Sequence, residues 1–265
     1  MLAQSFSTCG WSKAPDWVEL LTHVVLTDHL IDYVADMCVA VDDLGWDRFS
    51  ILGHSLGGTV GTFMAAVWPD RYVAPFASCH TPAVSLTAHL PRSVQRVVLV
   101  ETLGPWATPV SKIPSQLARS IAKRSHRPPR VHPTLEAAAV ANSKGFLKTP
   151  LPATRVMVER GVRPASAGAG GKQGYVWRAD PRLREVSRMP FTEEVVRAFI
   201  EAVMCPVLVI TAADGLYAKR DPQEVARRLS WFSHLKHVEL SAGSHHCHLI
   251  VPDKVAREAV PFLAA

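Results

Sequence analysis

The sequence predicts an α/β fold, in which a mostly parallel sheet is flanked by helices. The first observation behind this prediction is that short apolar runs, typical of buried strands, alternate along the chain with helical patterns. The second is that a serine framed by glycines separates one of these strands from the next helix. With 265 residues, 48% of them hydrophobic, the chain could form one large domain with an insertion or two small domains.

The first predicted elements are a helix, a strand and a second helix. Apolar residues recur at helical spacing over 30–41, and Gly45 follows at a position that suits the end of a helix. The run 49–52 is short and apolar, as a buried strand would be. The segment 59–68 then has the composition of a helix.

The second half of the chain continues the same alternation. Strands are expected at 96–101, 206–211 and 235–240, and a closing helix at 255–263. The long segment between the first two of these strands has helical or loop character. Helices are predicted there at 114–124 and 132–142, and a flexible loop at 165–174. Thr192 is a good N-cap for a helix that runs to Val203, with acidic residues in its first turn.

The motif Gly53-His54-Ser55-Leu56-Gly57 is the most informative feature of the chain. It has the form G-x-S-x-G and stands between a predicted strand and a predicted helix, the context of the nucleophile elbow of α/β-hydrolases. We expect glycine to be required at positions 53 and 57, because a side chain at either would strike the neighbouring strand or helix where the chain reverses. The N–H of Leu56 would be one oxyanion donor. The alternative interpretation is a Gly/Ser turn without chemistry.

A serine nucleophile needs a base that an acid orients, and in this fold the chain order is serine, acid, histidine. His245 follows the last predicted strand and is the predicted base, with His246 and His248 as packing or orienting neighbours. No second cluster has matching spacing, so a metal is not expected. Asp214 lies in a short turn after the strand at 206–211 and is the preferred acid. Glu101, at the end of the preceding strand, is the alternative.

The long segment after Glu101 lies where α/β-hydrolases carry a cap over the active site. We therefore predict a core made of residues 1–103 and 204–265 and a helical cap over 104–203. The predicted reaction needs only water, so no cofactor is expected.

Charge and cysteine usage limit which classes of partner and which cellular compartment are expected for this chain. The net charge of +6 is spread along the chain, and its one dense basic stretch, 123–132, is interpreted as a solvated loop. It lacks the aromatic or motif support of a nucleic-acid site. The five cysteines are scattered, which favours a reducing compartment over a disulfide framework. No leader pattern and no run of about 18 apolar residues is visible, so a cytoplasmic protein without a membrane span is expected.

Several motifs together resemble the serine hydrolase-like proteins of the α/β-hydrolase superfamily. They are the run 44–58, the pair 160–162 and 174–183, the stretch 205–208 leading to Asp214-Gly215, and the segment 245–255. The resemblance covers most of 30–70 and 94–265. It implies a serine hydrolase of an ester-like small molecule, with Ser55 as nucleophile and His245 as base.

The chain also departs from this family. Hydrolases of this type carry a His-Gly segment after an early strand, and the loop there supplies the second oxyanion N–H. In this chain no histidine is followed by glycine, and Cys9-Gly10-Trp11 is the nearest match. The 29 residues before the first helix suffice for one or two strands, so we expect incomplete N-terminal strands and an elbow strand near a sheet edge. Some twenty unpatterned residues lie within 71–93. Gly215 stands where many hydrolases place their acid, which keeps Glu101 open.

Two functions are therefore consistent with the sequence. One is a serine hydrolase of carboxylic esters. The other is a catalytically silent relative or truncated isoform that binds a ligand or a partner. Neither the natural substrate nor the oligomeric state follows from the residues.

Overall fold

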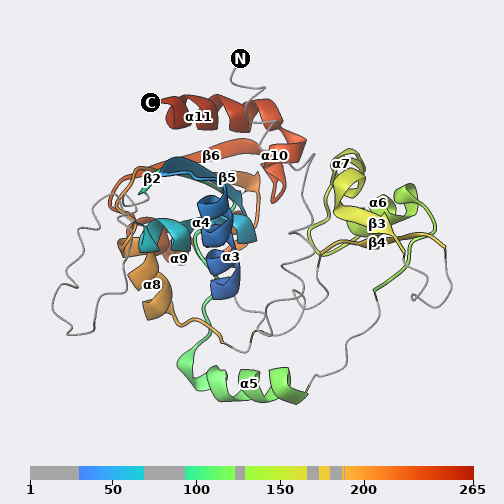
Figure 1. Cartoon of the computed structure of the whole chain (residues 1–265), viewed down its shortest axis with the longest axis horizontal. Coiled ribbons are helices and arrows are strands. Elements are labelled where there is room, and N and C mark those ends of the chain that lie inside the picture. The colour runs from blue at the N-terminus through green and yellow to red at the C-terminus, as the bar shows by residue number, and fades with distance from the viewer. Residues whose placement is uncertain (1–29, 69–92, 123–128, 166–172, 180–186, 188) are drawn as a thin grey trace.

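A central sheet of four parallel strands organises the computed structural model, which describes residues 30–68, 93–122, 129–165, 173–179, 187 and 189–265 (Figure 1). Its strands are β1 (Arg48–His54), β2 (Ser93–Val100), β5 (Val207–Asp214) and β6 (Leu235–Ser244), in the order β1-β2-β5-β6. Within the described residues β1 is an edge strand. The predicted parallel sheet is confirmed.

Alternating strand residues build a core on each face of this sheet. On one face, Leu99 and Val209 pack with α8 (Glu193–Glu201), which also contacts α4 (Leu56–Val67). On the other face, Val100 and Ile210 pack with α11 (Pro252–Ala264). Because both faces are covered, the two central strands, β2 and β5, are buried and apolar along most of their length, as parallel strands usually are.

The remaining helices extend this arrangement. Helix α3 (Leu30–Asp43) packs on α4, and α9 (Pro222–Leu229) lies between β5 and β6 in the chain. Helix α10 (Cys247–Ile250) precedes α11. The short 3-10 helices η2 (Val110–Lys112) and η4 (Tyr217–Lys219) follow β2 and β5, respectively. No helix in the described parts is long and apolar enough to cross a membrane.

A smaller group of elements stands beside the central sheet (Figure 1). Helices α6 (Leu135–Ser143) and α7 (Leu151–Gly161) pack against an antiparallel pair, β3 (Val162–Pro164) and β4 (Tyr175–Trp177). Helix α5 (Ile113–Ala122) lies apart from this group.

Most predicted elements are confirmed, with shifted ends. The helix predicted at 132–142 begins at Leu135, because His132 forms a bridge with Tyr175 instead. The pair β3–β4 was not predicted, since strands of three residues are too short to show a period. The strand β6 runs four residues beyond the predicted end at 240. The predicted features within 1–29, 71–92 and 166–172 lie outside the described residues.

The carboxyl ends of the four parallel strands meet at one edge of the sheet, where ligands bind in open α/β folds. Ser55 follows β1 directly, and Glu101 follows β2. Asp214 is the last residue of β5, and His245 follows β6. All four residues predicted to carry the chemistry therefore lie at this edge.

Candidate active site

Ser55 stands on a strained turn between β1 and α4. Its backbone φ is 52°, a left-handed value that is uncommon for residues other than glycine. Its N–H donates to the carbonyl of Val100 in the neighbouring strand, and its own carbonyl accepts from the N–H groups of Gly58 and Thr59. These hydrogen bonds hold the turn in the strained conformation and lift the serine side chain out of the strand.

The close approach at this turn involves Gly53 and Gly58. A Cβ on Gly53 would lie 2.5 Å from the Cα of Gly58, and one on Gly58 would overlap the Thr102 side chain. The prediction for Gly53 is thus confirmed. The prediction for Gly57 is wrong, because a Cβ there meets no described atom within 4 Å. The helix begins at Leu56, so the residue facing back toward β1 is one position later than expected.

His245 lies directly against the serine. Its Nε2 is 2.9 Å from Ser55 Oγ, within hydrogen-bond distance. His245 is 4% exposed, so the atoms packed around it fix the orientation of its imidazole. The pair can pass the serine hydroxyl proton to the imidazole, the step that turns a hydroxyl group into a nucleophile.

Glu101 lies on the other side of the same imidazole. Its Oε2 is 3.4 Å from His245 Nδ1, and the side chain is fully buried. Two backbone N–H groups hold the carboxylate: Ala212 donates to Oε1 at 2.8 Å and Leu216 to Oε2 at 2.7 Å. The backbone of Glu101 has φ 54°, a second left-handed value at this edge of the sheet. Strain of this kind gathers at functional sites.

The structure brings Glu101, and not Asp214, to the predicted base. Asp214 is exposed, and its backbone continues the ladder with β6 by pairing with Ser244. Gly215 then follows, and a Cβ on Gly215 would overlap both carboxylate oxygens of Glu101. The position after β5 is thus empty of a side chain, and the glutamate from the next strand occupies that space. This geometry favours the alternative acid over the preferred one.

The other histidines surround the base as neighbours. His54 Nε2 donates to the carbonyl of His245 at 2.7 Å, and the two rings lie 4.6 Å apart. Burial lowers the pKa of His54 to about 3, and the nearby His248 adds to this effect. His246 contacts Thr149 Oγ1 through Nδ1 at 2.9 Å, and burial lowers its pKa to about 4. His54 is therefore neutral near pH 7, and it ties the loop that carries the base to the serine turn.

Ser55 directly precedes the N-terminus of α4, so the first backbone N–H groups of this helix lie next to the serine in the chain. Leu56 is the first residue of this helix, and such N–H groups have no partner within the helix. They also carry the positive end of the helix dipole, which favours an anion. The other expected oxyanion loop, near Cys9-Gly10-Trp11, lies outside the described residues.

A cavity of about 380 Å³ opens over Ser55 and Glu101. Its wall is mainly apolar and includes Leu30, Leu56, Trp106, Met189 and Phe191. No lysine or arginine lines it among the described residues. A cavity of this volume suits a small molecule with an uncharged, apolar part.

Three contributors to the site were not identified from the sequence. Trp106 lines the cavity, Tyr217 accepts the N–H of Leu103 through its hydroxyl oxygen, and Arg228 donates to the carbonyls of Leu103 and Pro105. In the sequence, Arg228 is one of two adjacent arginines on an amphipathic helix. Nothing in that pattern distinguishes it from the exposed Arg227.

Comparison with known proteins identifies the family that this chain matches. The family described as the alpha/beta hydrolase family matches residues 3–258. A serine hydrolase-like protein from Danio rerio is 27% identical over 246 residues, which cover 87% of this chain and 65% of that protein. A serine hydrolase-like protein from Dictyostelium discoideum is 23% identical, and 62% of its length is matched. The chain thus spans less than two thirds of the length of these relatives.

Solved structures give the same fold. A hypothetical protein from Pseudomonas aeruginosa PAO1 is 27% identical and superposes with a TM-score of 0.72 over 91% of this chain and 77% of its own. The thioesterase domain from the curacin biosynthetic pathway is 16% identical, with a TM-score of 0.65 over 88% of this chain and 73% of its own. The second likeness concerns the fold alone.

Proposed function

The chain belongs to the alpha/beta hydrolase family, and on that basis we propose that it is a serine hydrolase of carboxylic esters. Ser55 is the nucleophile, His245 the general base and acid, and Glu101 the acid that orients the imidazole. The observation that carries the proposal is the pair of contacts around His245. Its Nε2 lies 2.9 Å from Ser55 Oγ, and its Nδ1 lies 3.4 Å from Glu101 Oε2.

In the first half of the reaction Ser55 Oγ attacks the carbonyl carbon of the ester. His245 Nε2 takes the hydroxyl proton, while Nδ1 keeps its proton directed at Glu101. The carbonyl electron pair moves to oxygen, and the N–H of Leu56 donates to this oxyanion. When the tetrahedral intermediate collapses, the bond to the alcohol oxygen breaks and His245 returns the proton to the leaving alcohol.

The second half repeats these steps with water. His245 takes a proton from water, whose oxygen attacks the acyl carbon bound to Ser55. The bond to Ser55 Oγ then breaks, and the proton on His245 goes back to that oxygen. The products are a carboxylic acid and the free serine, so the cycle needs no cofactor.

The cap belongs to the same proposal. Residues 104–203 supply Trp106, Met189 and Phe191 to the cavity over Ser55, which supports their role as a cap on a core of 1–103 and 204–265. Helix α8, near the end of this segment, packs on α4 in the core. We therefore propose that the cap is anchored through α8 and shapes the space for the acyl group.

Labelling with a fluorophosphonate tests this function. Such a reagent phosphonylates only an activated serine, so intact-mass analysis of the folded protein should show one adduct. The Ser55→Ala variant should show none, and His245→Ala should label far more slowly, while Asp214→Asn labels as the wild-type chain does. An unlabelled protein that is demonstrably folded would contradict the proposal and leave ligand or partner binding as the remaining function.

A further inference from the structure

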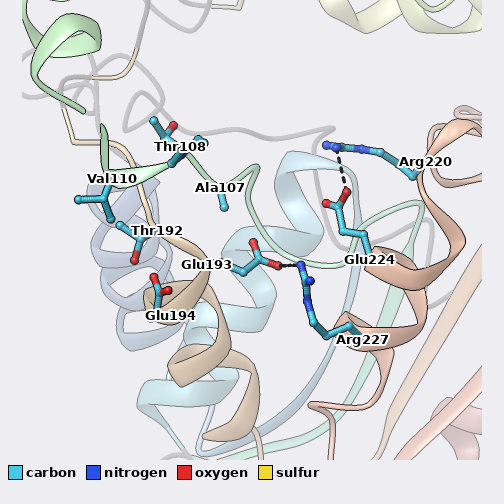
Figure 2. A pocket seen from close by; sticks show the side chains of 10 residues that line it. Ala107, Thr108, Val110, Thr192, Glu193, Glu194, Arg220, Glu224 and Arg227 are labelled. Carbon is cyan, nitrogen blue, oxygen red and sulfur yellow. Dashed lines mark hydrogen bonds and ion pairs between the residues drawn. The ribbon is translucent and has the colours of Figure 1, made fainter. Parts of the chain in front are cut away.

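Two cavities flank the loop that follows β2. The first is the active-site cavity over Ser55. The second measures about 340 Å³ and is lined in part by charged side chains from α8, from α9 and from the residue that follows η4, among them Glu193, Arg220 and Arg227 (Figure 2). Thr108 lines both cavities. Trp106 lines the first and Arg220 the second, so this loop forms part of the wall of each.

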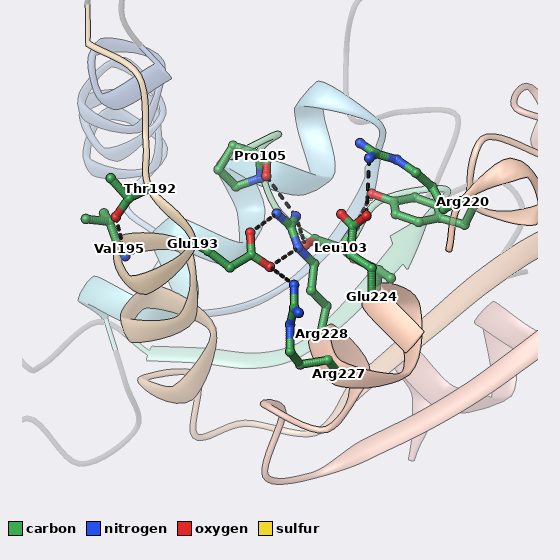
Figure 3. A network of polar contacts seen from close by, with 10 residues as sticks. Leu103, Pro105, Thr192, Glu193, Val195, Arg220, Glu224, Arg227 and Arg228 are labelled. Atoms are coloured by element: carbon green, nitrogen blue, oxygen red, sulfur yellow. Dashed lines mark hydrogen bonds and ion pairs between the residues drawn. The ribbon is translucent and has the colours of Figure 1, made fainter. Parts of the chain in front are cut away.

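Trp106 is held from behind by Arg220. The guanidinium carbon of Arg220 lies 3.6 Å from the centre of the Trp106 ring, a close cation–π contact. Arg220 Nη1 donates to Glu224 at 3.3 Å, which fixes the guanidinium (Figure 3). The buried Nε of Arg220 has no hydrogen-bond partner among the described residues.

The backbone beneath Trp106 is also clamped. Arg228 is 4% exposed, and its Nη1 donates to the carbonyls of Leu103 at 3.1 Å and Pro105 at 2.8 Å. Its Nε and Nη2 donate to the two carboxylate oxygens of Glu193 at 3.1 and 2.7 Å (Figure 3). The loop is therefore fixed on both sides of Gly104, and the indole is presented in one orientation.

This support contrasts with the exposure of the indole itself. Trp106 is 58% exposed although its rear face carries Arg220. Met189 and Leu56, which line the same cavity, are also exposed. A rigidly held aromatic ring with an open face beside a reactive serine has the properties of a binding platform, since its position costs little entropy on binding. Apolar side chains left open around a cavity mark a site that binds apolar groups.

We propose that Trp106 is the specificity-determining residue of the site and binds the uncharged alkyl or aryl acyl group of the ester, with Arg220 as its positioning residue. This inference rests on the proposed hydrolysis by Ser55. Among the described residues, Glu101 is the only charged side chain that lines this cavity. A dicarboxylate half-ester would bring its negative charge toward Glu101, and no lysine or arginine among the described lining residues would balance it. The site therefore selects neutral acyl groups long enough to reach the indole.

Ester hydrolysis with a constant leaving group tests the platform. We would measure kcat/KM for p-nitrophenyl acetate, butyrate and octanoate with the wild-type chain and with Trp106→Ala, Trp106→Phe and Arg220→Gln. Trp106→Ala should lower the octanoate value about tenfold or more and the acetate value less than about threefold, because only the long chain loses apolar contact. Trp106→Phe should retain most of the octanoate activity. Arg220→Gln should fall between the wild-type chain and Trp106→Ala.

Two matched controls separate this effect from a general one. Trp46→Ala removes another exposed tryptophan, which precedes β1 and packs on Phe49 of that strand, and this variant should leave the acyl-length profile unchanged. Arg227→Gln removes a neighbouring arginine that lies over the ring of Trp231 and not over that of Trp106. It should also leave the acyl-length profile unchanged. An equal loss with all three esters in Trp106→Ala would overturn the inference and leave the proposed hydrolysis standing.

Ligand binding distinguishes failure of the inference from failure of the function. Octanamide binding to Ser55→Ala can be followed by calorimetry, since that variant cannot turn the amide over. Binding that is lost in Ser55→Ala/Trp106→Ala supports the platform, even if the wild-type chain hydrolyses no ester. Equal binding by both variants would overturn it, whatever the hydrolysis assay shows.

Discussion

Replacing Glu101 with glutamine tests whether this carboxylate, and not Asp214, orients the base. Glutamine keeps the size of the side chain but removes the negative charge 3.4 Å from His245 Nδ1. It also brings an amide N–H₂ group to a place where the carboxylate now accepts the N–H groups of Ala212 and Leu216. The variant thus loses the charge and at least one backbone hydrogen bond.

The geometry sets the size of the expected effect. Two unit charges separated by 3.4 Å attract by about 5 kcal/mol at an effective dielectric constant of about 20. This attraction arises only after His245 has taken the proton of Ser55, so it stabilises the transition state more than the resting enzyme. Because two backbone N–H groups already share the charge of Glu101, we expect less than the full amount, a loss of about 10³-fold in kcat/KM.

The assay compares Glu101→Gln with Asp214→Asn, which removes one carboxylate charge near the same sheet edge. We would measure kcat/KM for p-nitrophenyl butyrate and, for each variant, thermal unfolding to confirm that it is folded. Asp214 is exposed, so its replacement should change kcat/KM less than about fivefold. A loss of about 10³-fold in kcat/KM for Asp214→Asn, with a folded Glu101→Gln close to the wild-type value, would show that Asp214 and not Glu101 orients the base.

Two further predictions concern the surroundings of the base. Gly215→Ala places a methyl group against both oxygens of Glu101 and should lower kcat/KM about 10²-fold; in the Glu101→Gln background the same change should have a much smaller effect, which a double-mutant cycle on p-nitrophenyl butyrate would detect. The pKa of His54 is lowered to about 3 in the folded protein. Below about pH 6.5 the unfolded chain therefore binds a proton at this residue that the folded chain does not bind. The free energy of unfolding should fall by up to about 1.4 kcal/mol for each pH unit from this residue. Urea unfolding over the range from pH 7 to about 4 should show that slope, reduced in His54→Gln and retained in the exposed control His234→Gln; equal slopes in all three proteins would contradict this origin.

The sheet and the serine turn could be predicted because short-range patterns encode them. The two central strands, β2 and β5, are mainly apolar runs that end at turns, and the spacing of Gly53 and Ser55 already indicates a sharp strand-to-helix turn. Parallel strands bring their carboxyl ends to one edge whatever their side chains. For that reason Ser55 and His245, 190 positions apart, could be assigned to one site from the sequence.

The acid could not be chosen in the same way. Chain order allowed both Asp214 and Glu101, and the choice depends on where β5 ends in space. The ladder between β5 and β6 extends to Asp214 and Ser244, which leaves Asp214 exposed, and the absent side chain of Gly215 makes room for Glu101. These are contacts between separate strands, and no local period or composition reports them.

The contacts that hold the loop after β2 could not be predicted from the sequence for a related reason. Arg228 contacts the carbonyls of Leu103 and Pro105 across more than a hundred positions of sequence. In the pattern of α9 it has the same appearance as a solvated charge. A buried arginine of this kind is recognised only when its carbonyl and carboxylate partners are seen around it.

The proposed mechanism requires Ser55 to form an acyl-enzyme. Rapid mixing of the protein with excess p-nitrophenyl butyrate, with optical detection of p-nitrophenol and acid-quenched peptide mapping, tests it most directly. We expect a burst of one p-nitrophenol per folded chain and a butyryl group on the peptide that contains Ser55. Release of p-nitrophenol without a burst and without acyl-Ser55, or at the same rate in Ser55→Ala, would contradict it.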